Sequence, residues 1–327
     1  MVKVTLAMGN GGEENLELIE RIQKFFHNDY LQKAEDATPL DGIEKPVMTT
    51  DSFTISPLFF NGGDIGKLSI AGSCNDLAMM GGRPLFLTFG LIVEEGFELK
   101  ILDKILNSMA KELKINGAKV VAGDTKVVPK GSVDGVFINI SAIGERQASL
   151  SQRNIEEGDV LLVSRDIATH GAAIFAAREG IELDNQIQSD CASLWPVIEE
   201  LMENVDIKAA RDATRGGVAA VLNEWARARG LTMEIDEESI PVSEPVKGIC
   251  EILGFEPLVL ANEGTFVAAV SSKEASRALE ILKKHNPNAA IIGKVGTQYP
   301  KKAILKSPWG TKRFLDMPSG EILPRIC

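Results

Sequence analysis

Residues 67–93 read KLSIAGSCNDLAMMGGRPLFLTFGLIV. The first part, 67–80, is rich in small residues and predicts a helix. The second part, 85–93, is a run of apolar, aromatic and β-branched residues closed by Glu94 and Glu95, which predicts a buried strand. A helix that leads through a short turn into a buried strand indicates an α/β protein, in which helices cover a sheet.

Helix and strand patterns alternate on both sides of this stretch. The expected strands lie at 2–7, 47–50, 119–122, 136–143, 160–164, 265–270 and 290–294. The expected helices lie at 16–26, 99–113, 171–179, 193–204, 217–229 and 273–285. The polar stretch 145–158 divides the chain, and 327 residues exceed one ordinary core. We therefore expect two domains, 1–150 and 151–306, followed by a tail at 307–327.

The composition is that of a globular protein, with 44% hydrophobic and 25% charged residues. The net charge of −11 opposes nonspecific binding to a phosphate backbone, so we expect no nucleic-acid partner. No apolar run reaches the roughly 18 residues of a membrane helix, and the first residues lack the pattern of a secretion signal. We therefore expect a cytoplasmic protein without a membrane partner. Four scattered cysteines, with no C-x-x-C pair, argue against a zinc site or a disulfide framework.

Five short turns combine an acidic side chain with small neighbours. They contain Asp51, Asp64, Asn75 with Asp76, Asp124 and Asp212. Magnesium prefers several hard oxygen ligands, and a phosphate needs close approach of the main chain, which glycine permits. Taken singly, each aspartate is more often a turn or helix-cap residue. Five such turns together favour a magnesium–nucleotide site.

Two glycine-rich segments are candidates for a phosphate cradle. The turn 9–12 lies between an expected strand and an expected helix, so Gly9, Gly11 and Gly12 could approach a phosphate with their main chain. The segment 61–68, NGGDIGKL, resembles a P-loop but has Asn61 and Leu68 where that motif needs glycine and serine or threonine. We therefore exclude a P-loop.

The chain ends in Pro324, Arg325, Ile326 and Cys327. Pro318 and Pro324 prevent a helix there, so we expect an extended arm that reaches roughly 30 Å. A cysteine at the tip of such an arm is a soft nucleophile that could dock in a pocket or meet a partner. The alternative is a frayed terminus without a function.

Several motifs together resemble one family along essentially the whole chain. They are the turn 9–12, TTDSF at 49–53, GDIGK at 63–67, NDLAMMG at 75–81, GDTK at 123–126, RDATRGG at 211–217, NEG at 262–264 and PRIC at 324–327. With them the chain resembles the nickel–iron hydrogenase maturation family HypE, and the terminal motif is the specific one. The acidic motifs are similar to those of the superfamily of aminoimidazole ribonucleotide synthetase, selenophosphate synthetase and thiamine-monophosphate kinase. At 8–12 this chain has MGNGG where the family is expected to have His-Gly-Ser-Gly-Gly, so only a main-chain phosphate role is expected there.

The resemblance implies a two-domain aminoimidazole ribonucleotide synthetase-like fold of the α/β (α+β) class. It implies an N-terminal sheet that forms a barrel in a homodimer and buries 85–93, a C-terminal α/β domain and a flexible C-terminal tail. It also implies that HypF provides a carbamoyl group for Cys327, and that ATP with Mg²⁺ drives dehydration of this group to a thiocyanate. The cyano group would then pass to the iron scaffold formed by HypC and HypD.

The resemblance also assigns roles to individual residues. The metal ligands would be Asp51, Asp76, Asp124 and Asp212, with Asp36 as a further candidate. The nucleotide would bind to Gly9, Gly11, Gly12, Asp51, Asp64, Asn75, Asp76, Asp124, Thr125, Arg211 and Thr214. Cys327 would carry the group, and Glu263 and Lys126 are the candidate bases, because the thiocarbamate must lose N–H protons. His170 matches a family position but is expected to be a hydrogen-bonded structural residue.

Two other functions stay open from the sequence. One is an ATP-dependent small-molecule synthetase or kinase such as selenophosphate synthetase, which would need a reactive cysteine or selenocysteine near the N-terminal turn, where this chain has Met8. The other is a thiol carrier without enzymatic activity, in which Cys327 only carries a group or ligates a metal. Arg211 and Arg215 could bind phosphate or pair with surface acids. Trp309 is expected to pack the base of the tail.

Overall fold

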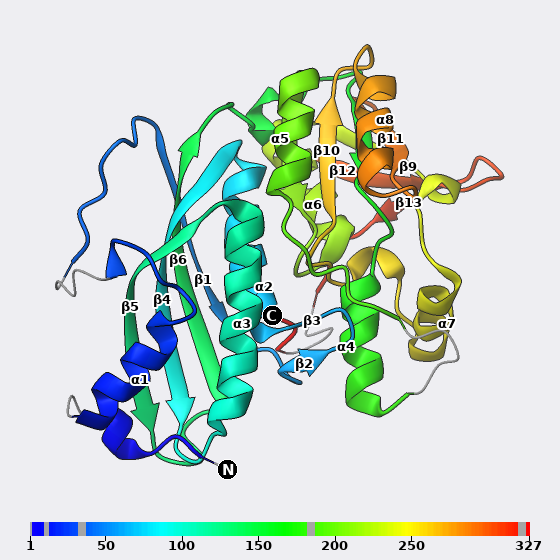
Figure 1. Cartoon of the computed structure of the whole chain (residues 1–327). Helices are drawn as coiled ribbons and strands as arrows, with labels where there is room; N and C mark the ends of the chain where they lie inside the picture. Colours follow the sequence, from blue (N-terminus) through cyan, green and yellow to red (C-terminus); the bar gives the residue numbers. More distant parts are fainter. Residues whose placement is uncertain (1, 10–12, 32–36, 182–186, 320–324) are drawn as a thin grey trace.

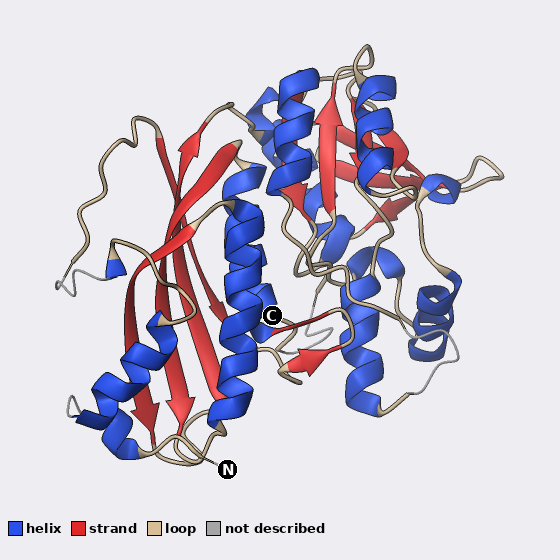
Figure 2. Ribbon diagram, in the orientation of Figure 1, coloured by secondary structure: helices blue, strands red, loops and turns tan. Residues whose placement is uncertain are grey.

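The structure is a computed structural model that describes residues 2–9, 13–31, 37–181, 187–319 and 325–327. It contains two mixed sheets, each accompanied by helices (Figure 1, Figure 2). The C-terminal end of the chain lies where the two halves of the molecule meet, between α2 and α4 (Figure 1). None of the described helices combines the length and the apolar character that crossing a bilayer requires.

The first sheet has the strand order β1-β6-β4-β5. Its strands are β1 (Pro46–Phe53), β4 (Gly82–Glu94), β5 (Lys119–Val128) and β6 (Val136–Arg146). Strand β4 pairs antiparallel with β6 and parallel with β5, so β1 and β5 form the two edges. Helices α2 (Ile65–Met79) and α3 (Leu99–Asn116) lie along one face, and α1 (Glu13–Gln23) packs near β5 (Figure 1).

Strand β4 shows that helices cover only one face of this sheet. Leu87, Leu91 and Val93 are at most 1% exposed, whereas Ile92, which points the other way, is 40% exposed. Helix α2 is buried almost all round, because it lies between the sheet, α3 and the second half of the chain. Its many small residues permit this close packing. The predictions of a helix at 67–80 and a buried strand at 85–93 are confirmed, and the burial of the helix on nearly all sides is a finding of the structure.

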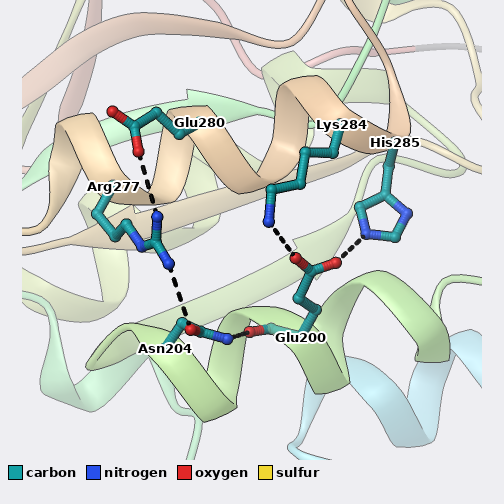
Figure 3. A network of polar contacts seen from close by, with 6 residues as sticks. All are labelled: Glu200, Asn204, Arg277, Glu280, Lys284 and His285. Atoms are coloured by element: carbon teal, nitrogen blue, oxygen red, sulfur yellow. Dashed lines mark hydrogen bonds and ion pairs between the residues drawn. The ribbon is translucent and has the colours of Figure 1, made fainter.

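The second sheet has the strand order β13-β12-β9-β11-β7-β10-β8. Its strands are β7 (Val160–Val163), β8 (Ile207–Asp212), β9 (Thr232–Asp236), β10 (Phe266–Val270), β11 (Ala290–Gly296), β12 (Lys302–Lys306) and β13 (Lys312–Leu315). One apolar layer includes α4 (Thr169–Glu179), α6 (Gly217–Arg229) and α7 (Glu244–Leu253). The other includes α5 (Trp195–Asn204) and α8 (Ala275–His285), where Glu200 accepts hydrogen bonds from Lys284 and pairs with His285 (Figure 3).

Short elements complete the fold. They are β2 (Phe59–Phe60), β3 (Gly63–Asp64) and the 3₁₀ turns Leu6–Gly9, Gln152–Asn154, Glu237–Ser239 and Pro257–Val259. The buried apolar residues form one cluster that lies mainly in the first half of the chain and two clusters around the second sheet.

Three expectations are wrong. The segment 2–7 is not a strand, because it meets only the loop after β4, through a single bridge between Lys3 and Glu98. The range expected to be a tail from 307 onward still contains β13, which pairs antiparallel with β12 in the second sheet. Trp309 does not pack the base of the tail, since it lies in the β12–β13 turn and is 88% exposed.

Candidate active site

Three of the predicted aspartates come together where the two sheets meet. Asp51 lies on β1, Asp76 lies on α2 and Asp212 is the last residue of β8. Burial and the neighbouring Asp76 raise the pKa of Asp51 to about 6, and the same two causes raise the pKa of Asp212 to about 7. All three line one pocket of about 530 Å³. Their mutual repulsion means that a cation at this place would be strongly favoured.

Other predicted residues line the same pocket. Arg211 lies near the end of β8, where it pairs with Glu224 at 2.8 Å, and Thr214 belongs to the turn between β8 and α6. This sharp turn depends on Gly216 and Gly217, whose φ angles of 79° and 60° are unfavourable for residues with a side chain. A Cβ atom on Gly217 would also collide with the carbonyl oxygens of the 257–260 segment.

The tail brings Cys327 to this site. The main-chain N–H of Thr54, one residue after β1, donates to the Cys327 carbonyl oxygen at 3.0 Å. Burial raises the pKa of the Cys327 thiol to about 11, with Glu263 and Asp51 adding to the rise and Arg215 opposing it. The docked thiol is therefore protonated at neutral pH. It is a poor nucleophile in this position.

Glu263 is the buried carboxyl group of the site, at 3% exposure. Burial, followed by Asp212 and Asp190, raises its pKa well above the ordinary value. Its Oε1 has no hydrogen-bond partner among the described residues. The main chain around it is held by Asp190, whose carboxylate accepts from the N–H groups of Glu263 and Gly264 and from the Thr265 hydroxyl.

Sequence reasoning named Arg215 only as a possible contact of phosphate or of surface acids, and it gave Thr49 no role in this site. Arg215 is the cation that opposes the raised pKa values of Asp51, Glu263 and Cys327. The Thr49 hydroxyl donates to Asp76 at 2.6 Å and so orients that carboxylate. Both residues stand inside the motifs quoted above, in RDATRGG and TTDSF, and this is the signal that could have found them.

Two residues predicted to bind nucleotide have structural contacts instead. Asp64 caps α2, since its Oδ1 accepts from the N–H groups of Gly66 and Lys67 and its Oδ2 accepts from the Ser108 hydroxyl. The buried Asn75 side chain donates to a carbonyl oxygen at position 192 and accepts from a main-chain N–H at position 194. It therefore ties α2 to the second half of the chain. These contacts account for the positions of both side chains, and nucleotide binding by either residue stays a prediction.

The remaining predicted residues form a second, separate group along β5. Asp124 and Lys126 pair with each other at 2.7 Å on the surface, with side chains 70% and 61% exposed. A smaller pocket of about 280 Å³ lies beside them and is lined by Gly9, Thr125 and apolar residues of α1 and β4. Gly9 itself packs closely against Val127. Gly11, Gly12 and Asp36 lie outside the described residues.

The pairing of the first sheet shows why the two groups stay apart in one chain. Phe53 pairs with Ile138, Ile138 with Leu91 and Leu91 with Thr125. Three strand spacings, about 14 Å, therefore separate Thr125 from the end of β1. The alternation of side chains also places Asp124 on the open face, opposite the helix-covered face of Asp51. Lys126 is thus not near the docked Cys327 of the same chain.

The carboxylates fit magnesium only in part. No three His, Cys, Asp or Glu side chains in the described part of the chain lie close enough to enclose a metal ion by themselves. Asp51 and Asp76 nevertheless share a hydrogen bond, which contributes to the raised pKa of Asp51. Magnesium commonly binds to one or two carboxylates and completes its shell with phosphates and water. A pair of carboxylates beside an open pocket fits that mode.

His170 confirms the expectation of a hydrogen-bonded structural residue. It is completely buried on α4. Its Nδ1 lies 2.7 Å from the Ser189 hydroxyl and its Nε2 lies 2.8 Å from the carbonyl oxygen of Ile326. Burial lowers its pKa, so the ring is neutral. A structural histidine therefore contacts the tail directly.

Comparison with known proteins gives a consistent assignment. Residues 34–146 match the N-terminal domain and residues 156–306 the C-terminal domain of the AIR synthase related protein family. The chain is 42% identical to carbamoyl dehydratase HypE of Escherichia coli (strain K12), with 100% of each chain covered. It is similar to a crystal structure of hydrogenase maturation protein HypE in complex with ATP, with a TM-score of 0.95, 38% identity and 99% of each chain covered. A structure of a HypE–HypF complex matches with a TM-score of 0.80, 46% identity, and 94% of this chain and 100% of that chain covered. The chain therefore belongs to the HypE family of carbamoyl dehydratases.

Proposed function

We propose that this protein uses ATP to dehydrate a carbamoyl group carried on Cys327 to a thiocyanate, and that it thereby supplies the cyanide ligands of the nickel–iron hydrogenase iron centre. The observation that carries this proposal is the docked tail. It holds the sulfur of Cys327 close to Glu263, Arg215 and the acidic group of Asp51, in a chain of the HypE family.

The reaction balances as two steps on one thiocarbamate. First, the amide oxygen attacks the γ-phosphorus of ATP, ADP leaves and one N–H proton is lost. Second, the C–O bond breaks, phosphate leaves with the former amide oxygen, and the remaining N–H proton is lost as the C≡N bond forms. Phosphorylation is needed because oxide or hydroxide is a poor leaving group, whereas phosphate is a good one.

The residues around the pocket can be assigned to binding the metal ion and the phosphate groups of ATP. Asp51 and Asp76 would hold Mg²⁺, which supplies charge neutralisation for the phosphates, and Asp212 would add an outer carboxylate. Arg211 and Thr214 line the pocket at positions from which they can contact phosphate oxygens. Arg215 would offset negative charge beside the docked tail.

Glu263 is the proposed proton acceptor near the sulfur. Burial and the neighbouring aspartates raise its pKa well above the ordinary value, which favours the protonated form, so Glu263 would act as a base only after losing that proton. Cations introduced with the nucleotide would favour this loss, because they stabilise the carboxylate. Lys126 is a base candidate only if it comes from a second copy of the chain.

A homodimer would supply that second copy. In a barrel made from two copies of the first sheet, the edge strand β1 of one copy meets the edge strand β5 of its partner. This arrangement would bring the β5 group, with Asp124, Thr125 and Lys126, to the acidic group of the other copy. It would also cover the open face, where Ile92 and Met48 are 40% and 65% exposed.

Mixed dimers test this sharing of the site. Asp76→Asn and Asp124→Asn homodimers should both be inactive, and co-expression of the two variants should restore activity, because mixed dimers contain one intact site. If the mixture stays inactive while both variants form dimers, the site is not shared.

The proposed partners follow from the reaction. HypF would supply the carbamoyl group, and HypC with HypD would accept the cyano group in the cytoplasm. Since burial keeps the docked thiol protonated, loading should take place while the tail is undocked and dehydration after it has docked again. Residues 325–327 would therefore need to leave the pocket for loading and to return to it for dehydration.

Mass analysis of the tail tests the function. After incubation with HypF, a carbamoyl donor and ATP, the peptide containing Cys327 should first gain one carbamoyl group and then lose one water, with one ADP released. ADP release without any change at Cys327 would favour a small-molecule kinase or synthetase. Loading without ATP turnover would favour a carrier that has no enzymatic activity.

A further inference from the structure

The last three described residues are held by many contacts that do not involve the reacting sulfur. The Arg325 carbonyl oxygen accepts from Arg178 at 2.7 Å and from the main-chain N–H of Ser56 at 3.4 Å. The Ile326 carbonyl oxygen contacts the ring of His170, and the Cys327 carbonyl oxygen accepts from the N–H of Thr54. The main-chain carbonyl group of each of these three residues is thus within hydrogen-bonding distance of a group outside the tail.

Helix α4 provides one wall of this site. His170, Ile174 and Arg178 are spaced four residues apart, so they lie along one side of the helix. They offer in turn a ring N–H, an apolar side chain and a guanidinium group. Ile174 belongs to the same buried apolar cluster as Ile326, which is only 4% exposed.

The segment after β1 provides the opposite wall. The Arg325 side chain donates from Nε to the Thr54 carbonyl oxygen at 2.8 Å and pairs with Asp134 at 2.7 Å. Its guanidinium also lies over the ring of Phe137, 5.8 Å from the centroid. Arg178 links the two walls, because its Nε donates to the Ser56 carbonyl oxygen at 2.7 Å.

Two features indicate a site built for this peptide. Arg325 adopts a φ of 50°, a left-handed conformation that residues other than glycine rarely take unless their surroundings impose it. None of the described hydrogen bonds that hold residues 325–327 uses the Cys327 sulfur. The site therefore recognises the peptide by its main chain, its arginine and its isoleucine. A group attached to the sulfur would not alter these contacts.

We propose that α4 and residues 54–56 form a binding site for an Arg-Ile-Cys peptide, which can bind in trans as well as in cis, and that His170 and Arg178 are its positioning residues. The proposal deepens the proposed function, since it identifies what returns the loaded cysteine to the active site. Free peptides of this sequence, and the tail of another copy, would be ligands of the same chemistry.

The rate at which iodoacetamide alkylates Cys327 in the full-length protein tests the proposal. Peptide mass analysis separates this cysteine from the buried Cys74, Cys191 and Cys250. An acetylated peptide with the sequence of residues 323–327, but with serine in place of the cysteine, should compete with the tail and accelerate alkylation. A peptide with the same residues in scrambled order should have no effect. No acceleration by millimolar specific peptide would overturn binding in trans.

Variants test the positioning residues in the same assay. Arg178→Ala and Ile326→Ala should each raise the alkylation rate about tenfold, which corresponds to about 1.4 kcal/mol of docking free energy. Arg277→Ala on α8 is the matched control, because this arginine binds Glu280 and Asn204 (Figure 3) and makes none of the described contacts with residues 325–327. His170→Gln, which keeps an N–H donor, should alkylate more slowly than His170→Leu.

Unchanged alkylation in both Arg178→Ala and Ile326→Ala, at unchanged thermal stability, would refute the site. If Arg178→Ala does not fold, Ile326→Ala and the competing peptide still decide the question. The assay uses neither ATP nor a carbamoyl donor. The alkylation result would therefore be the same whether or not the protein dehydrates a carbamoyl group. The assay reports only whether the tail is docked.

Discussion

Replacement of Asp51 by asparagine should stabilise the protein at alkaline pH while removing a proposed metal ligand. Burial and Asp76 raise the pKa of Asp51 from its ordinary 3.8 to about 6. The folded protein thus binds this proton more tightly than the unfolded chain does. The resulting contribution to stability is fully present below about pH 4 and is lost as the pH rises through about 6. At about 1.36 kcal/mol per pKa unit, the whole effect is about 3 kcal/mol, of which about 1.4 kcal/mol falls between pH 5 and pH 8.

Urea unfolding at pH 5, 6, 7 and 8, without nucleotide or magnesium, measures this effect. The free energy of unfolding of Asp51→Asn, relative to the unmodified protein, should rise by about 1.4 kcal/mol between pH 5 and pH 8. Asp236→Asn is the control, because this exposed aspartate pairs with Lys306 on the surface and should show no such trend. A relative stability that stays flat with pH, or falls, would refute the idea that buried carboxylates repel one another in the site.

Four further substitutions distinguish residues that act in the reaction from residues that stabilise the fold. Asp76→Asn should lower magnesium-dependent ATP turnover at least about tenfold, since it removes an anionic ligand, and unchanged turnover would exclude Asp76 from the site. Asn75→Ala should lower the free energy of unfolding by about 1–3 kcal/mol, because it removes two buried hydrogen bonds. The ATP affinity, measured by calorimetry, should stay unchanged. A large loss of affinity would show that Asn75 contacts the nucleotide. Asp64→Ala should cost about 1–2 kcal/mol through the lost helix cap, with unfolding in urea as the measurement. Cys327→Ala should abolish carbamoyl loading, detected by mass, but bind ATP normally, and full loading of this variant would contradict the mechanism.

Much of the fold could be predicted from the sequence because its elements are long and strongly patterned. Helix α2 is rich in small residues and strand β4 is a nearly continuous apolar run, so the sequence indicates both elements and the burial of the strand. The β12–β13 hairpin was not predicted, because Pro308, Trp309 and Gly310 resemble a loop that leads into a tail. Strand β12 is stabilised by pairing with β9, which only the folded sheet provides, and β13 in turn pairs with β12.

The candidate site was predicted in part. Asp51, Asp76 and Asp212 come together, whereas Asp64 has the helix-cap role that an aspartate before a helix commonly takes. Asp124 could not be placed from sequence. Its distance from the other aspartates depends on the strand order, in which β5 and β1 are opposite edges of the sheet. From the sequence alone, Asp124 could therefore belong to the site of its own chain or to the site of a second copy.

The fate of the carbamoyl oxygen tests the central claim most directly. The protein is loaded on Cys327 with a carbamoyl group that carries isotopically labelled oxygen, and ATP is added in unlabelled water. The account predicts that the label appears in inorganic phosphate, one labelled oxygen per thiocyanate formed on Cys327. Label recovered in water, or thiocyanate formed without labelled phosphate, would contradict activation of the carbamoyl group by ATP.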